Sequence, residues 1–290
     1  MWVRMKLLFL KEMDELIQKE EFTEERKEKY RKWVANAEAA RNAGSLDETM
    51  NQYDKAEELL TWYTFAPMLR MNTEQRIITI NKFLNPLLGS DVVVSNPRLN
   101  FEKMLLPSES YYGNIVADHP VRYIRGEIES HRKRGMLLEK HTHIDLLMET
   151  DELIIPIEAK FTSDIDYQTT YSCTRNQIAR TIDVSMEAAK RAQPPKKVIF
   201  LLCVPREFYN QGRYYYYKMK DYENLENLKH DLPHQTASFE TYFHSTHVIF
   251  WENIASTIIR NAMEWKLLDS DELNALKAFY AERLIKFSLE

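Results

Sequence analysis

Glycine is scarce in this chain, with six among 290 residues. No segment reads G-x-x-x-x-G-K-[ST] or G-x-G-x-x-G, so the usual phosphate-cradling loops for ATP and dinucleotides are absent in recognisable form. A G-x-S-x-G nucleophile elbow is missing as well. Any chemistry therefore has to come from polar side chains rather than from glycine-dependent loops.

Cysteine and long apolar runs are also rare. Cys173 and Cys203 are too few for an all-cysteine zinc site, and we expect both to act as small core hydrophobes in a reducing cytosol. No run approaches the about 20 apolar residues of a membrane span. The N-terminal run MWVRMKLLFLKEMDEL is charged and amphipathic, unlike a signal peptide. These features predict a cytoplasmic protein that does not enter a membrane.

The net charge of −5 argues against a protein that only coats nucleic acid, because such proteins are usually basic. It leaves an enzyme open, since a nuclease has an acidic centre and local DNA contacts. Residues 121–140 carry six Lys/Arg against three Glu, and residues 173–197 carry six against two acids. Basic segments around an acidic centre suit phosphate binding.

The pattern changes along the chain near residues 88–100, which predicts a helical N-terminal domain (1–90) and a second domain (91–290). The first part has helical spacing throughout. Helices are expected from Thr23 to Ala43, from a capping box at Ser45, and from Asn72 or Thr73 to Pro86, the last two with helix-start signals.

The second part alternates strands with helices, which predicts an α/β sheet covered on both faces. The tyrosine-rich segment 213–218 reads as half-buried strand, with base stacking as an alternative. Closing helices are expected over 252–288, with a break at Asp269 or Ser270. The other expected elements are strands at 121–130, 143–149, 153–161, 196–204 and 247–251, and a helix at 174–192.

Two of these strands flank a polar tip within HIDLLMETDELIIPIEAKF, residues 143–161. If Asp151 and Glu152 form a two-residue hairpin loop, counting outward along both strands places Asp145 opposite Glu158. Cross-strand neighbours lie about 4.5–5.5 Å apart at Cβ. The sequence therefore predicts two carboxylates in one small volume.

Lys160 shares the face of Glu158, because side chains alternate along a strand. Two close carboxylates repel each other, and a divalent cation relieves that repulsion; Mg²⁺ favours such oxygen ligands, with Mn²⁺ as a substitute. A lysine beside them can orient the attacking water or stabilise developing negative charge. The alternative is a surface strand with an ordinary ion pair, but the flanking residues are too apolar for a solvated strand.

This arrangement resembles the PD-(D/E)XK phosphodiesterase superfamily, which includes many restriction endonucleases. The resemblance covers roughly residues 100–204 and rests on Asp145, on Glu158-Ala159-Lys160 after a hairpin, and on the following helix and buried strand. It implies a mixed sheet with an α-β-β-β-α-β core flanked by helices. It also implies that Asp145 and Glu158 bind the metal and that Lys160 assists catalysis.

Many members of the family place a further acid on the first core helix. Glu109 is the preferred counterpart as a metal ligand, with a simple helix-dipole role as the alternative; Glu127 and Glu129 are rivals. Several branches also place a Gln or Arg on the helix after the motif, which implies site roles for Gln177 and Arg180. The alternative interpretation is that both residues lie on a solvent-exposed helix face.

Other polar residues carry weaker signals. His141 and His143 flank the strand of Asp145, and structural or DNA-contacting roles are expected rather than metal binding. The run Arg132-Lys133-Arg134 reads equally as a DNA contact or a solvated turn.

The expected function is therefore a Mg²⁺-dependent DNA endonuclease, for which cutting both strands would favour a homodimer. The alternatives are a repair or defence nuclease acting on branched or single-stranded DNA, and a non-catalytic nucleic-acid-binding module. The N-terminal helices would recognise DNA or mediate dimerisation.

Overall fold

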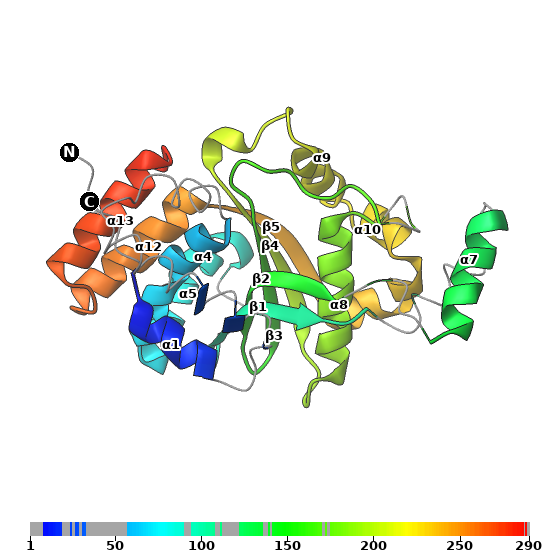
Figure 1. Cartoon of the computed structure of the whole chain (residues 1–290), viewed down its shortest axis with the longest axis horizontal. Helices are drawn as coiled ribbons and strands as arrows, with labels where there is room; N and C mark the ends of the chain where they lie inside the picture. Colours follow the sequence, from blue (N-terminus) through cyan, green and yellow to red (C-terminus); the bar gives the residue numbers. More distant parts are fainter. Residues whose placement is uncertain are drawn as a thin grey trace. The chain divides into compact units, whose positions relative to one another are not determined.

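Two compact units make up the chain in a computed structural model: Met1–Pro86 with Phe250–Glu290, and Leu87–Ile249 (Figure 1). The residues that the structure describes are 8–18, 24, 27–28, 31–32, 57–89, 94–107, 111, 122–135, 139, 141–169, 172, 175–286 and 288. None of the described helices combines the length and apolar character needed to cross a membrane.

The first unit is helical and includes both ends of the chain. Its elements are α1 (Leu10–Gln18), α4 (Glu57–Phe65), η1 (Ala66–Arg70), α5 (Thr73–Leu88), α12 (Trp251–Glu264) and α13 (Ser270–Glu282). The expected helix after Asn72 is confirmed, because Asn72 and Gln75 cap one another through reciprocal hydrogen bonds of 3.0 and 2.9 Å. The break before α13 is confirmed at Asp269, the N-cap of a capping box with Glu272. The helices expected from Thr23 and Ser45 lie largely or wholly outside the described residues.

Residues 250–290 group with the N-terminal helices, whereas the sequence assigned them to the second domain. The reason is aromatic packing between segments about 200 residues apart. The Tyr63 and Phe279 rings meet edge to face at 4.6 Å, and the hydroxyls of Thr64 and Tyr280 are hydrogen-bonded at 2.6 Å. Such pairing leaves no signal in local periodicity, so the sequence could not reveal it.

The second unit is α/β, with a five-stranded mixed sheet in the order β1-β2-β3-β4-β5. The strands are β1 (Arg98–Leu105), β2 (Thr142–Glu149), β3 (Leu153–Ala159), β4 (Lys197–Val204) and β5 (Phe243–Phe250). β1, β2 and β3 are antiparallel neighbours, and β4 runs parallel to β3. The helix α8 (Gln177–Arg191) packs against β3 and β4. The expected strands β2 to β5 and this helix are confirmed.

The remaining described elements of this unit are helices. They are α7 (Arg122–Lys133), η2 (Arg206–Phe208), α9 (Tyr214–Asp221), α10 (Leu225–Asp231), η3 (Pro233–Ser238) and α11 (Phe239–Tyr242).

Two segments expected to be strands are helices. Residues 122–130 belong to α7, where the spacing of four between Ile124 and Ile128 fits a helix as well as it fits alternation. Residues 213–218 open α9, whose first N–H groups, from Tyr214 and Tyr215, donate to the Asp164 carboxylate at 2.6 and 3.1 Å. An N-terminal cap supplied by an aspartate 50 residues away cannot be read from the helix's own sequence.

The strand β1 is not among the strands expected from the sequence, because Pro97 and Pro107 interrupt the pattern of this region. In the structure they flank the strand, which pairs with β2 from Arg98 opposite Glu149 to Leu105 opposite Thr142. β1 therefore contributes its own residues to the face of the sheet that carries Asp145.

Replacing Asp269 with alanine should destabilise the helical unit by about 1 kcal/mol, because the Glu272 N–H loses its cap at 2.8 Å. All five tryptophans lie within residues 1–86 and 250–290, so tryptophan fluorescence during urea unfolding reports this unit. Asp271→Ala, an exposed change in the same helical turn, is the control and should shift the midpoint less. Equal shifts for both variants would contradict the assignment of Asp269 as the cap.

Candidate functional site

The β2–β3 hairpin has the register that the sequence predicts. Residues 151–152 form the loop, and the Thr150 N–H donates to the Leu153 carbonyl at 2.9 Å. The ladder pairs Glu149 with Ile154 and Leu146 with Ile157. Continued by one position, this register sets Asp145 directly opposite Glu158.

Asp145 sits where the β2–β3 ladder ends. Its Oδ2 accepts a hydrogen bond from the Ala159 N–H at 2.7 Å, in place of a backbone carbonyl of β2. The half-buried carboxylate is thereby drawn toward the end of β3, between the two strands. The end of β3 stays bonded to the strand on its other side, because the Lys160 N–H donates to the Cys203 carbonyl of β4 at 2.9 Å.

Glu158 and Lys160 form a buried ion pair at the end of β3. Their residues are 2% and 6% exposed, and Lys160 Nζ lies 3.0 Å from Glu158 Oε1. Two side chains of α8 reach the same carboxylate: Gln177 Nε2 donates to Oε1, and Thr181 Oγ1 lies 3.5 Å from Oε2. Gln177 and Thr181 are four residues apart, so they share one helix face. The structure thus brings together Asp145, Glu158, Lys160 and Gln177.

The electrostatics of the site are strained by its two facing acids. Burial, and then the charge of Glu158, raise the pKa of Asp145 well above its ordinary value. Lys160 and the Ala159 N–H act in the opposite direction, and Glu102 adds to the increase. Positive charge from one lysine therefore does not fully compensate the acids around Asp145.

Glu102 is the acid that sequence reasoning missed. Its neighbours Phe101 and Lys103 pair with Leu146 and Ile144, so the register sets Glu102 beside Asp145 on the other flank of β2. Glu102 is buried and has a φ of 53°, a left-handed conformation that is uncommon for residues other than glycine. Backbone strain of this kind clusters at functional sites. Only the recognition of 98–105 as a strand could have singled it out.

Several other predicted residues that the structure describes are not brought to the carboxylates. The guanidinium of Arg180 ion-pairs with Asp166 at 3.8 Å, and its buried Nε has no hydrogen-bond partner among the described residues. Glu127 and Glu129 lie on helix α7 rather than on a strand of the sheet, and the side chains of His141 and His143 are exposed. Glu109 lies outside the described residues, after β1 rather than before the first strand.

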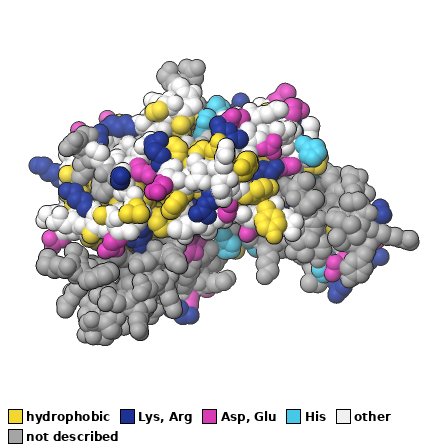
Figure 2. Space-filling model, turned by 90° about the horizontal axis from the view of Figure 1, so that it is seen from above, with side chains coloured by type: hydrophobic (Ala, Val, Ile, Leu, Met, Phe, Trp, Pro, Cys, Tyr) yellow, Lys and Arg dark blue, Asp and Glu magenta, His cyan; other side chains and the backbone are white. Residues whose placement is uncertain are grey.

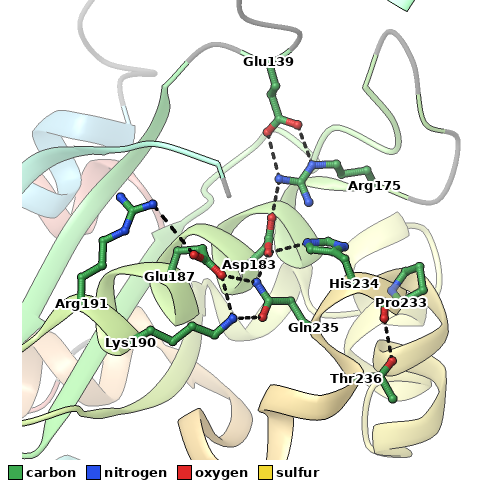
Figure 3. A network of polar contacts seen from close by, with 10 residues as sticks. All are labelled: Glu139, Arg175, Asp183, Glu187, Lys190, Arg191, Pro233, His234, Gln235 and Thr236. Atoms are coloured by element: carbon green, nitrogen blue, oxygen red, sulfur yellow. Dashed lines mark hydrogen bonds and ion pairs between the residues drawn. The ribbon is translucent and has the colours of Figure 1, made fainter. Parts of the chain in front are cut away.

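The opposite side of α8 is fixed by a buried polar network (Figure 3). Asp183 accepts from Gln235 at 2.6 Å, lies 2.8 Å from the His234 ring, and ion-pairs with Arg175 at 2.8 Å. Burial alone would raise the pKa of Asp183, but the contacts with His234, Arg175 and Gln235 hold it at about 2. Arg175 in turn ion-pairs with Glu139 at 2.6 Å. These contacts hold α8 on this side. The helix therefore presents Gln177 and Thr181 to Glu158 in a fixed position.

The described part of the chain does not offer a large set of side chains as metal ligands. It contains no group of three or more His, Cys, Asp or Glu side chains arranged to hold a metal ion. Comparisons with protein-family models, with curated proteins and with solved structures returned no match. The argument for function therefore rests on the geometry around Asp145 and Glu158.

Replacing Asp145 with asparagine should stabilise the protein in the absence of divalent cations. A carboxyl with a raised pKa keeps its proton in the folded protein over a pH range in which the unfolded chain has lost it. Wild-type stability therefore falls as the pH rises through that range, whereas asparagine does not ionise and can still accept from Ala159. The gain should be larger at pH 8 than at pH 4, measured by calorimetric unfolding in a chelator. Glu152→Gln in the exposed hairpin loop is the control; an Asp145→Asn protein less stable than wild type at pH 8 would contradict this account.

Proposed function

We propose that this chain is a metal-dependent DNA endonuclease with a PD-(D/E)XK-type centre. The observation that carries the proposal is the hairpin register, which sets Asp145 opposite Glu158 with the Lys160 ammonium 3.0 Å from the Glu158 carboxylate. An Asp, a Glu and a Lys on adjacent strands are the three groups that the resemblance requires. A purely structural ion pair would need one acid for the lysine, not two facing each other.

The order of elements supports the same proposal. Three antiparallel neighbours, β1, β2 and β3, are followed by α8 and by the parallel strand β4. This matches the strand–strand–strand–helix–strand portion of the family core, with α7 inserted between the first two strands. A restriction-endonuclease-like core thus remains a proposal that the topology favours.

Mg²⁺ fits the donor chemistry of this site. It commonly binds one or two carboxylates and fills its other positions with water and substrate phosphate oxygens, so a site with few protein ligands suits it. Asp145 and Glu158 would hold the ion, and its positive charge would oppose the burial and the charge of Glu158 that raise the pKa of Asp145. When bound, the ion lowers the pKa of coordinated water and stabilises charge on the phosphoryl group.

The protein's own residues have distinct roles in this proposal. The Lys160 ammonium orients the attacking water and neutralises charge that develops on the phosphate. Gln177 donates to Glu158 and so fixes the orientation of its carboxylate. The Ala159 N–H does the same for Asp145.

DNA is the proposed partner, through local basic contacts rather than a uniform basic field. On the face drawn in Figure 2, the coloured Lys and Arg side chains are interspersed with Asp and Glu. Lys133 and Arg134, at the end of α7, are exposed and are available to phosphates. A homodimer remains the expectation for cutting both strands.

Incubation of supercoiled plasmid with Mg²⁺ tests the activity directly. Wild-type protein should nick or linearise the plasmid, and Asp145→Asn and Lys160→Ala should each lower the rate on the order of 100-fold or more, because each removes a group that stabilises the transition state. The matched controls are Glu152→Gln in the hairpin loop and Lys229→Ala, which removes a surface ion pair of α10. Both controls should cleave like wild type.

Two outcomes would contradict the endonuclease. Cleavage that survives in both site variants would mean that the activity has another source. DNA binding without cleavage under Mg²⁺ or Mn²⁺ would support the binding module instead. Single-stranded and branched substrates in the same assay separate a repair or defence nuclease from one that acts on plain duplex.

Gln177 should act by positioning Glu158. Gln177→Ala should lower kcat about tenfold while KM changes little, because the lost hydrogen bond orients a catalytic carboxylate and does not contact DNA. Gln177→Glu should fare worse, since it adds a carboxylate beside Glu158. Single-turnover cleavage as a function of DNA concentration separates the two constants; a change confined to KM would assign Gln177 to DNA binding instead.

A further inference from the structure

A cavity lies in the α/β unit, beside the edge strand β5. It has a volume of about 500 Å³, within the range of small-molecule sites. Its lining includes Tyr209, Tyr222, Phe243, His244, Ser245 and His247. No role in the proposed cleavage uses these residues.

Two histidines and a serine form a hydrogen-bonding cluster in this cavity. The Ser245 hydroxyl lies 2.8 Å from His244 Nδ1 and 2.9 Å from His247 Nε2. A hydroxyl has one hydrogen, so at least one of the two rings must donate to it. The cluster therefore combines donors and acceptors within a small area, which is the chemistry of a nucleobase edge.

The charge of the cavity does not favour a phosphate group. Burial, and then Lys197, lower the pKa of His244; burial, and then His244, lower that of His247, so a positive charge on either ring is disfavoured. The lysine on the lining, Lys220, is ion-paired with Glu223 at 2.6 Å. On the lining itself a bound anion would therefore meet a lysine that is already ion-paired, since Lys197 is not one of the lining residues.

Aromatic rings supply the rest of the recognition surface. Tyr222 and Phe243 are largely buried, and Tyr209 is half-buried. The Tyr209 ring is braced by Tyr216, with ring centroids 5.0 Å apart. Rings of this kind stack on bases regardless of sequence.

The cavity is also linked to the helix of the candidate site. The Tyr222 hydroxyl accepts from Asn176 Nδ2 at 2.6 Å and donates to Asp231 at 2.6 Å. Asn176 is the N-cap of α8, immediately before Gln177. A ligand that contacts Tyr222 would therefore be connected through Asn176 to the neighbouring Gln177, which orients Glu158.

We infer that this cavity binds an unpaired nucleobase, stacked on Tyr209 and hydrogen-bonded to the Ser245 cluster. That the base belongs to a DNA strand rests on the proposed function; binding of a free nucleoside does not. An enzyme with such a site would favour substrates that present at least one unpaired nucleotide.

Nucleoside titrations of the full-length Asp145→Asn protein, without divalent cations, test this site independently of cleavage. The probes are deoxyadenosine, deoxyguanosine, deoxycytidine, thymidine, inorganic phosphate and Zn²⁺, followed by the NMR signals of the His244 and His247 rings. At least one nucleoside should bind saturably, and phosphate should not. Tyr209→Ala should weaken binding about tenfold and Ser245→Ala about fivefold. Tyr217→Ala, an exposed tyrosine of α9 outside the cavity lining, should leave it unchanged.

Three results would overturn the inference: no nucleoside affects the rings, phosphate binds as well as any nucleoside, or Zn²⁺ alone binds. If nucleosides bind but the wild-type protein does not cleave DNA, the inference about this cavity stands and the endonuclease proposal is wrong. Cleavage without nucleoside binding would do the reverse.

Discussion

Two carboxylates held face to face on adjacent strands are the constraint around which the α/β unit is organised. Asp145 and Glu158 meet at the end of the β2–β3 ladder, where repulsion is costly because the surroundings are largely buried. Lys160, Gln177 and the Ala159 N–H each offset part of that cost. Burial, and then the charge of Glu158, still raise the pKa of Asp145. A divalent cation is the group that would complete the compensation.

Helix α8 connects this site to the rest of its unit. One face carries Gln177 and Thr181 to Glu158, and the other buries Asp183 against Arg175 and His234. A buried network whose members are paired holds a helix in one position, because displacement would leave charges unsatisfied in a low-dielectric interior. The N-cap of the same helix, Asn176, donates through its amide to Tyr222, which lines the β5 cavity. The position of α8 relative to Glu158 is thus determined by contacts on several sides of the helix.

The sequence predicted the parts that depend on local patterns. Alternation and a polar turn predicted the β2–β3 register, and helical spacing predicted α8. A site role for Gln177 came from the family resemblance rather than from the spacing. The predictions that failed concern features that depend on residues far away in the sequence. The Asp164 carboxylate starts α9 from 50 residues away, and the Tyr63–Phe279 contact joins the two ends of the chain. Glu102 was missed because the charged strand β1 is defined by its pairing with β2 rather than by its own pattern.

A crystal grown with Mn²⁺ and examined by anomalous diffraction tests the central claim most directly, because it locates the ion without depending on activity. The account predicts an anomalous peak within about 2.5 Å of carboxylate oxygens from both Asp145 and Glu158. A well-diffracting crystal at saturating Mn²⁺ with no peak there, or with its peak elsewhere, would contradict a metal site at these two acids.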